Sequence, residues 1–529
     1  MEAKHIEQAN ALHQNIAQAI EELRVSDALR LLGSIQLVHT HWAIHEAYES
    51  IGQMHQQMIG YMVQGVKDEQ RKKLYATMRR QLFELNNLVL AYNLADSTEE
   101  FYAVRRYIQQ RHLTIEEEVT RIVASNRHLV SLHNTTSNPT LRQQYDACLT
   151  EGYSHCDNVF KLIWTSLQLT PAEQEILHTC LHNMDLPDTY CSVWVSALML
   201  GCYQYFDIAK VKLLTSLLSH TSPLLQARSL VALCIILTRS EAEFARYYPE
   251  EHTTLHRLLT EKSHAQHVVE VQELLNISQL TEKVVRHTNE ALMNTITQLQ
   301  QTLGSEDTIA TTVEHTDVES QLEHLVVRLR SLYQRQADIH YGSFAMFKHR
   351  LPFYKTMMNW FVPFTTTHPA LRSATSSMRH SPHSTWLINA PLCSNDRYTM
   401  AMLLAMMPRE SHEEIVAQMK LHNLSEEDIE EAIKEEVQPS LSREIRYYLQ
   451  DLYRFFALYT PSSKTARQWF IETPVLTTST TLTASLQSTK QLIVLADDAF
   501  ALGLYSSAQQ LYQACEQVEG LGSEQFYNL

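Results

Sequence analysis

Apolar residues recur along this chain at the spacing of amphipathic helices. From Leu74 to Tyr92, successive apolar positions are separated by 4, 4, 3, 4 and 3 residues. These steps place one apolar stripe along a single helix face. The chain shows no convincing run of the alternating polar and apolar residues that mark a half-buried strand. The pattern therefore predicts an all-α protein.

Polar breaks divide this helical pattern into regions. The segments 134–139, 304–316, 365–384 and 473–489 are polar and are expected to be loops or linkers. The regions expected are an N-terminal helical region at 1–135, helical pairs at 140–303, a helix with an aromatic junction at 317–364, a helical region at 385–470 and a terminal repeat at 491–529.

Length and composition support long helices and narrow the choice of partners. A chain of 529 residues is too long for one compact core, so several domains or an extended solenoid are expected. Only 11 glycines and 14 prolines interrupt it, which favours long helices. The formal charge of −16 disfavours a nucleic-acid partner.

The sequence is typical of a cytoplasmic protein. The N-terminal ten residues lack the apolar core of a signal peptide. The most apolar runs are shorter than the ~20 residues of a membrane span, so no membrane partner is expected. The 8 cysteines are scattered without a Cys-x-x-Cys motif and are expected to be reduced and buried.

The middle of the chain predicts stacked helix pairs. Apolar helices are expected at 193–205, 207–220 and 223–238, with a Ser-Pro turn before the last and Arg228 near its start. Two consecutive apolar helices with such a turn resemble a HEAT- or armadillo-type pair. Units of this kind bury their apolar faces only by stacking on neighbours.

The end of the chain resembles a tetratricopeptide (TPR) repeat, which has a 34-residue period. Gly503 lies at the expected turn between its two helices. The positions that match the motif are Leu492, Leu495, Ala496, Ala499, Ala508 and Tyr512. One period later the chain stops at Leu529, inside the next opening motif. The apolar face of 505–518 is therefore expected to be covered by repeats further downstream, by a partner or by a second copy. Tyr505 and Tyr512 are candidate partner-binding residues.

A cluster of seven aromatic residues lies between 344 and 364. It permits two interpretations: a buried plug between the two helical parts, or an exposed anchor for a partner. We favour burial, because exposing so much apolar area invites aggregation. Phe353, Trp360 and Phe361 are the candidate partner-binding residues of the second interpretation.

Together these pieces resemble a group of large uncharacterised bacterial proteins that join a HEAT-like helical N-terminal region to C-terminal TPR repeats. The resemblance implies a scaffold architecture and carries over no catalytic residue. The matching segments are 189–239, 344–364, 392–408, 445–456 and 491–529.

Candidate chemistry is limited to histidines and one polar turn. Two histidines four residues apart can share a metal, but no third ligand is evident for any of these pairs. The turn 395–397 permits a site or, more simply, a helix cap at Asp396. Nucleotide-binding and hydrolase motifs are missing from the sequence. The histidine pairs are His41 and His45, His178 and His182, and His252 and His256.

The sequence therefore predicts a non-enzymatic helical-repeat solenoid without a cofactor, which binds a protein or peptide. A second copy that binds through the terminal repeat is a further candidate partner. The alternative is a metal-dependent enzyme or regulator that uses a histidine cluster.

Overall fold

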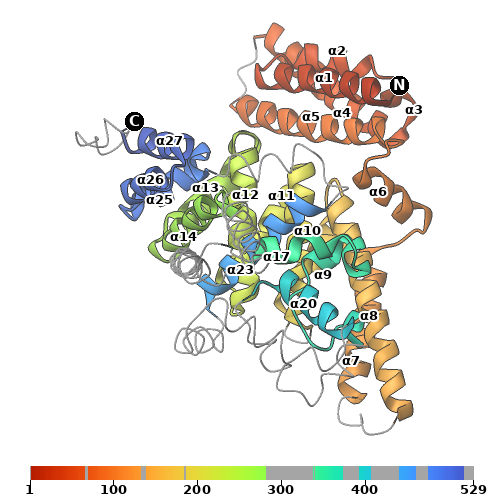
Figure 1. Cartoon of the computed structure of the whole chain (residues 1–529). Coiled ribbons are helices and arrows are strands. Elements are labelled where there is room, and N and C mark those ends of the chain that lie inside the picture. The colour runs from red at the N-terminus through yellow and green to blue at the C-terminus, as the bar shows by residue number, and fades with distance from the viewer. Residues whose placement is uncertain are drawn as a thin grey trace, which may run out of the picture.

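The computed structural model of the chain describes residues 2–65, 69–132, 139–183, 186–281, 338, 340–372, 392–406, 440–459 and 475–516. Every regular element in these ranges is an α-helix or a short 3-10 helix, which confirms the expected all-α class (Figure 1). The linker expected at 304–316, nearly all of the loop at 134–139, most of the loop at 365–384 and the residues after 516 lie outside the described part.

The N-terminal helices form a bundle of their own at the top of Figure 1. The stripe predicted from the apolar spacing is buried from Met78 to Val89, whereas Leu74 at its start is 37% exposed. His13 and Asn86 tie the first helix of this bundle to the last: the ring Nδ1 lies 2.7 Å from Asn86 Oδ1, and Asn86 Nδ2 donates to the His13 carbonyl. The bundle contains α1 (Glu2–Glu21), α2 (Val25–Gly33), α3 (Gln36–Thr40), α4 (Trp42–Val63) and α5 (Arg71–Asn93).

The centre of the molecule is built around two apolar helices, α10 and α12. All residues of α10 from Tyr190 to Tyr203 are buried, so this helix has no solvent face. The helix before it starts at a capping box, in which Thr170 Oγ1 accepts from Glu173 N and Glu173 Oε2 accepts from Thr170 N. The central helices are α6 (Glu100–Gln110), α7 (Ile115–Leu132), α8 (Pro139–Thr165), α9 (Pro171–His182), α10 (Asp188–Gln204), α11 (Ile208–Ser216) and α12 (Pro223–Tyr247), with the 3-10 helix η2 (Leu217–Ser219) between the last two.

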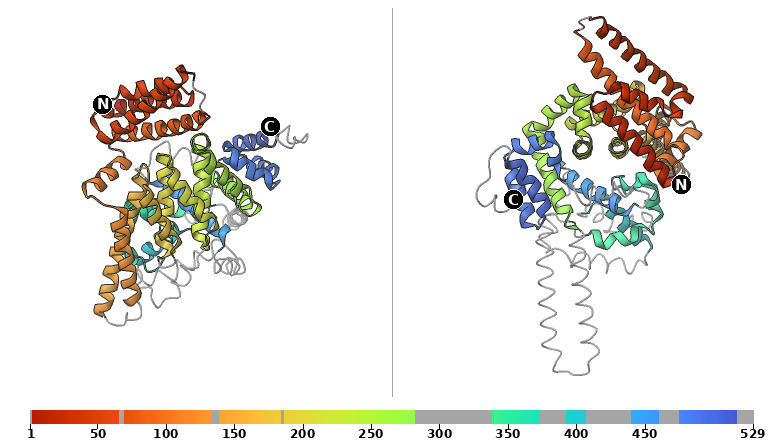
Figure 2. Two further views of the ribbon diagram at one scale, coloured as in Figure 1. Left: turned by 180° about the vertical axis from the view of Figure 1, so that it is seen from behind. Right: turned by 90° about the horizontal axis from the view of Figure 1, so that it is seen from above.

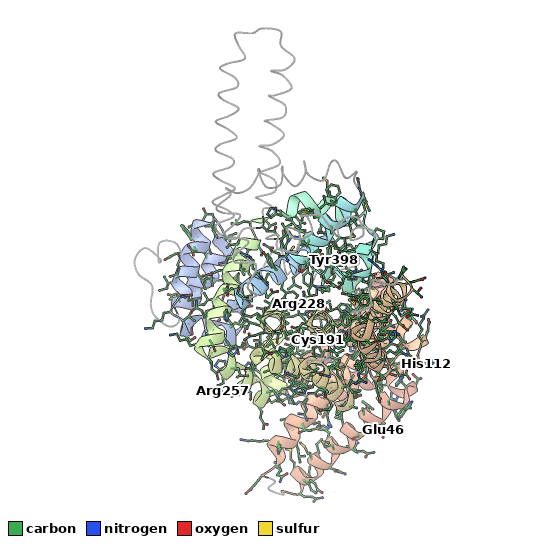
Figure 3. All side chains as sticks on the ribbon, turned by 90° about the horizontal axis from the view of Figure 1, so that it is seen from below. Glu46, His112, Cys191, Arg228, Arg257 and Tyr398 are labelled. Atoms are coloured by element: carbon green, nitrogen blue, oxygen red, sulfur yellow. The ribbon has the colours of Figure 1, made fainter. Side chains whose placement is uncertain are left out.

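Helix α12 also has the length and hydropathy of a membrane span, alone among the helices that the structure describes. Two-thirds of its most apolar window (67%) is buried inside the protein. Near its start it carries Arg228, which is labelled in Figure 3 and is only 2% exposed. Helix α12 therefore belongs to the core of this fold.

The C-terminal helices return to pack on the end of α12 and the two helices after it (Figure 2). Helix α12 kinks at Ser240, and the next residue, Glu241, caps α25 by accepting from the backbone N–H groups of Thr480 (2.6 Å) and Thr481 (2.9 Å). These helices are α13 (Pro249–Thr260), α14 (Lys262–Ser278), α25 (Thr480–Ser488), α26 (Leu492–Ala501) and α27 (Tyr505–Glu516), preceded by η6 (Leu476–Thr478). The expectation of a linker at 473–489 was therefore wrong, because α25 forms there behind an N-cap at Ser479.

The terminal helix pair has the turn that the sequence predicts, since Gly503 adopts a positive φ of +72° between α26 and α27. The structure corrects the expectation that the apolar face of 505–518 lacks a neighbour. Described residues of that face, such as Leu511 and Tyr512, are fully buried, and Ser507 bonds with Gln279 just beyond α14. The chain's own earlier helices therefore cover this face.

The aromatic stretch folds into short helices that lie against the centre. They are α17 (Tyr341–Lys348), η3 (Pro352–Lys355), η4 (Met357–Trp360) and η5 (Pro369–Leu371), and they pack with α20 (Ser394–Met406) and α23 (Leu441–Leu458).

Candidate functional site

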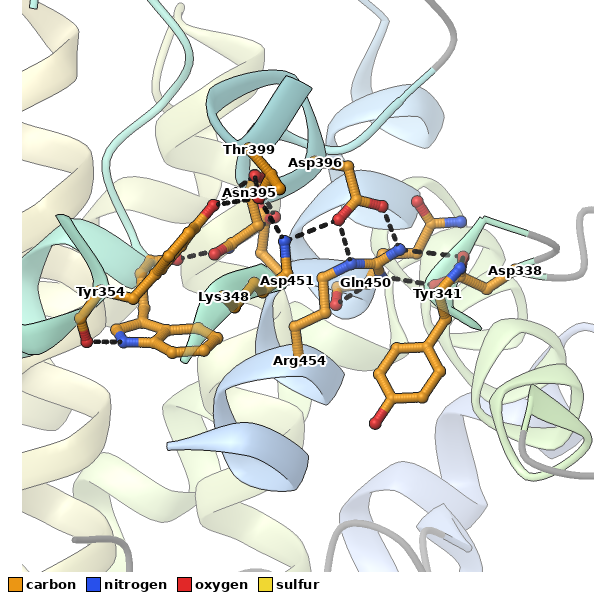
Figure 4. Close-up of polar contacts among 11 residues, drawn as sticks. Asp338, Tyr341, Lys348, Tyr354, Asn395, Asp396, Thr399, Gln450, Asp451 and Arg454 are labelled. Atoms are coloured by element: carbon orange, nitrogen blue, oxygen red, sulfur yellow. Dashed lines mark hydrogen bonds and ion pairs between the residues drawn. The ribbon is translucent and has the colours of Figure 1, made fainter. Parts of the chain in front are cut away.

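The most distinctive polar arrangement in the described residues is a buried charge network where α17, α20 and α23 meet (Figure 4). We define the junction network as Asp338, Lys348, Asp396 and Arg454. The exposed fraction of these side chains is 8%, 0%, 0% and 1%, in that order. Two cations face two anions, so the network is balanced in formal charge.

Asp396 is the centre of the junction network. Its Oδ1 accepts from Lys348 Nζ at 2.8 Å and from Arg454 Nε at 2.9 Å, and Arg454 Nη2 donates to Oδ2. Burial alone would raise the pKa of Asp396, but the charges and hydrogen bonds of Arg454 and Lys348 hold it below its ordinary value. Asp396 is therefore ionised at neutral pH.

Arg454 binds Asp338, the second carboxylate of the junction network, as well as Asp396. Its Nη2 donates to Asp338 Oδ1 at 3.0 Å, and its Nη1 donates to Asp338 Oδ2 and to the Gln450 carbonyl (3.1 Å). Asp338 lies just before α17, while Arg454 belongs to α23. The guanidinium therefore holds two carboxylates that are 58 residues apart in sequence, a geometry that suits its rigid fork of donors.

A second set of buried bonds fixes the aromatic stretch to α20 and α23. Asn395 donates from its backbone N (2.9 Å) and its Nδ2 (2.8 Å) to Asp451 Oδ1. The same Nδ2 donates to the Trp360 carbonyl at 2.8 Å, and Trp360 Nε1 donates to the Tyr354 carbonyl at 3.0 Å. Burial raises the pKa of Asp451 above its ordinary value.

These contacts correct the simpler interpretation of the turn 395–397. Helix α20 begins at Ser394, so Asp396 lies inside the first turn and not ahead of the helix. Its carboxylate binds Lys348 and Arg454 from other segments. Asp396 is thus an interior ion-pair partner rather than the expected helix cap.

Arg228 connects the junction to the central helices. It is 2% exposed, and its Nη1 donates to the Phe361 carbonyl at 2.6 Å and to the Ser192 carbonyl of α10 at 2.9 Å. Its guanidinium also lies over the Tyr448 ring of α23, 4.8 Å from the ring centroid. The Arg228 side chain of α12 therefore contacts the aromatic stretch, α10 and α23 at the same time.

The structure places four of the five proposed partner-binding residues in the interior. Phe353 is 5% exposed, Trp360 2%, and Phe361 and Tyr512 0%. Their rings fill the seams between helices, so none presents an anchor on the surface. Tyr505, which is 65% exposed, is the exception.

The histidine pairs do not converge on a shared ligand set. No group of three or more His, Cys, Asp or Glu side chains within the described ranges is arranged to hold a metal ion. His252 Nε2 lies 3.0 Å from Glu241 Oε1, and His256 Nδ1 lies 3.2 Å from Thr481 Oγ1. This pair therefore contributes to the docking of α25.

The two other pairs have different surroundings. The rings of His178 and His182 lie 4.5 Å apart, and His182 Nε2 is 3.1 Å from Ser216 Oγ. The His41 ring instead packs against Tyr92, with centroids 4.6 Å apart. Neither pair has a carboxylate bonded to it among the contacts described.

Sequence reasoning missed the junction network because its partners are 48, 58 and 116 residues apart. One local signal does mark it. Lys348 and Arg454 each follow directly on an aromatic residue, and in α23 every residue from Asp451 to Ala457 is buried. A lone arginine in such a run must find an anion, because an unpaired buried charge is too costly.

Comparison of the chain with family models, with curated proteins and with solved structures gives no match. Its function is therefore inferred from its own residues.

Proposed function

We propose that this protein is a non-enzymatic helical scaffold that acts in the cytoplasm, needs no cofactor and binds other proteins or peptides. The observation that carries this proposal is the pairing within the junction network. Lys348, Asp396 and Arg454 are buried and bind one another, so their charges serve to hold three segments together. A reactive site would instead present such groups to a substrate.

Antiparallel pairing of consecutive helices supports a repeat architecture of the HEAT type. Glu118 of α7 accepts from Asn158 of α8, while further along α7 the Ser125 carbonyl accepts from Cys148, earlier in α8. The order of these contacts is that of an antiparallel pair. Stacked pairs of this kind form the extended surfaces on which solenoid proteins bind their partners.

The terminal hairpin supports a TPR-type unit at the end of the described chain. Ala496 and Ala508 are 0% and 1% exposed, which lets α26 and α27 approach closely. Tyr512 fills the seam, and its hydroxyl donates to Asp497 Oδ1. The Tyr505 ring is exposed, and its centroid lies 5.3 Å from the centroid of the Phe500 ring. We infer that this aromatic pair is the contact point for the partner.

Affinity capture from native lysate with the full chain tests this function, with bound proteins quantified by mass spectrometry. We expect a protein held at a near-equimolar ratio by the wild type and lost from Tyr505→Ala. Trp42→Ala is the matched control, because Trp42 is also exposed (77%) but lies in the N-terminal bundle. The control should retain the partner.

Metal analysis of the purified chain tests the opposing hypothesis. An equimolar metal that disappears from a His41→Ala, His45→Ala double variant, together with the absence of any retained protein, would overturn the scaffold proposal. It would favour a metal-dependent enzyme or regulator instead.

A further inference from the structure

The last turn of α4 exposes apolar side chains to water. Ile59 is 45% exposed, Tyr61 52%, Met62 56% and Val63 83%. Because successive residues of an α-helix are rotated by about 100°, these four side chains spread over an arc of about 200° around the axis. A protein groove would contact one face of such a turn. An arc this wide exceeds the roughly 100° stripe by which a helix packs against protein, and it suits insertion into a continuous apolar medium.

The neighbouring turn of the bundle adds a second exposed apolar group. Helices α1 and α5 run antiparallel, since Arg79 Nε donates to the Ile20 carbonyl (3.2 Å) and Tyr75 Oη to the Leu23 carbonyl (3.0 Å). Leu23 therefore lies beside the start of α5. It is 51% exposed and has a φ of +63°, in the left-handed region that disfavours a branched side chain. This conformation ends α1 in a Schellman motif, in which the Arg24 N–H donates to the Ala19 carbonyl at 2.8 Å.

Two lysines stand beside these apolar groups. Lys72 and Lys73 lie in the first turn of α5, are exposed and form no ion pair with a described residue. The positive end of the helix dipole disfavours cations at this position, so helix stability does not account for them. Around them, Glu69 is exposed, while Arg24 is paired with carboxylates of its own turn. These two exposed lysines beside exposed apolar side chains contrast with the net negative charge of the whole chain.

We propose that this end of the N-terminal bundle binds the surface of an anionic lipid bilayer. Met62 and Val63 enter the boundary between headgroups and acyl chains, and Tyr61 lies at headgroup level, where amphipathic rings are favoured. Lys72 and Lys73 contact the anionic headgroups. The expectation of no membrane partner rested on the lack of an apolar run of ~20 residues, which one inserted turn does not need.

Vesicle flotation with the full chain tests the proposal. The probes are vesicles of phosphatidylcholine alone and of phosphatidylcholine with phosphatidylserine, at low and high salt. We expect binding to the anionic vesicles that weakens as salt is added. A Met62→Glu, Val63→Glu double variant should lose most of this binding. Replacing both lysines by alanine should weaken it by about 25-fold, at about fivefold for each lysine.

The matched control is Val130→Glu, because Val130 is 69% exposed on α7, away from the bundle end. It should bind as the wild type does, and circular dichroism should show that all variants remain folded. Wild-type protein that stays unbound on anionic vesicles would overturn the proposal, as would equal binding by the Met62, Val63 variant. A wild-type dimer that this variant dissociates, without any vesicle binding, would assign the surface to a second copy instead.

Discussion

His368 offers a sharp test of the packing around the aromatic junction. It is 5% exposed, and its ring packs against Tyr153, Phe353 and Tyr398, with centroids 4.3, 5.3 and 5.4 Å away. Its Nδ1 accepts from the Ala370 N–H at 3.1 Å, so the neutral ring carries its proton on Nε2. Nε2 makes no hydrogen bond to a described residue. Burial lowers the pKa of His368 from 6.5 to about 3.

The sign of the pH effect follows from this shift. Folding favours the neutral ring, so the contribution of His368 is fully present above the unfolded pKa of about 6.5 and is lost as the pH falls toward 3. With these two values, the free energy of unfolding falls by about 2 kcal/mol between pH 7.5 and pH 5. Tyr153 and Tyr398, which face the ring, have raised pKa values and stay neutral throughout this range.

Urea unfolding followed by circular dichroism at both pH values measures this loss, and comparison with variants isolates it from other titrating groups. His368→Asn keeps an acceptor for the Ala370 N–H, and His368→Phe keeps the ring. We expect both to be less stable than the wild type at pH 7.5 but to lose about 2 kcal/mol less on acidification. The hydrogen-exchange protection factors of residues 365–372 should fall in acid only in the wild type. Identical acid slopes in all three proteins would refute the neutral, buried histidine.

Three further substitutions test the packing elsewhere. Asp396→Asn leaves the buried Arg454 without its full counter-charge and should lower the free energy of unfolding by about 3–5 kcal/mol, measured by urea unfolding. Trp360→Ala should cost about 3–5 kcal/mol; normal stability would contradict its burial. Gly201→Ala should cost about 1–3 kcal/mol in thermal unfolding, because the added Cβ would lie 2.5 Å from Lys210 Nζ and near two backbone carbonyls. An unchanged melting temperature would show that the lysine moves aside freely.

Features that depend on neighbouring residues in the sequence were predictable. The apolar stripe of α5, the capping box at Thr170 and the turn at Gly503 each need only a few adjacent positions. Helix periodicity and capping chemistry are local, so they can be recognised without knowing the rest of the fold. The all-α class follows from the same local signals.

The partners of buried polar groups were not predictable in this way. Glu241 was one acidic residue among many, yet it caps a helix that starts 239 residues later. The face of α27 was expected to lack a neighbour among the chain's earlier helices, because nothing in the local sequence shows that η6 and Gln279 lie against it. Long-range pairing depends on how the whole chain packs, and a single sequence does not record it.

The junction network explains why the fold places charges in an otherwise apolar interior. Helix α23 is buried at every position from Asp451 to Ala457, so apolar contacts alone would not distinguish one rotation of this helix from another. Replacing buried ion pairs with apolar groups often leaves stability unchanged or higher, so stability alone does not account for them. Arg454 must face both Asp338 and Asp396, and this requirement selects a single rotation of α23. The same bonds fix α17 and α20 against it, so the charges define how these three helices pack together.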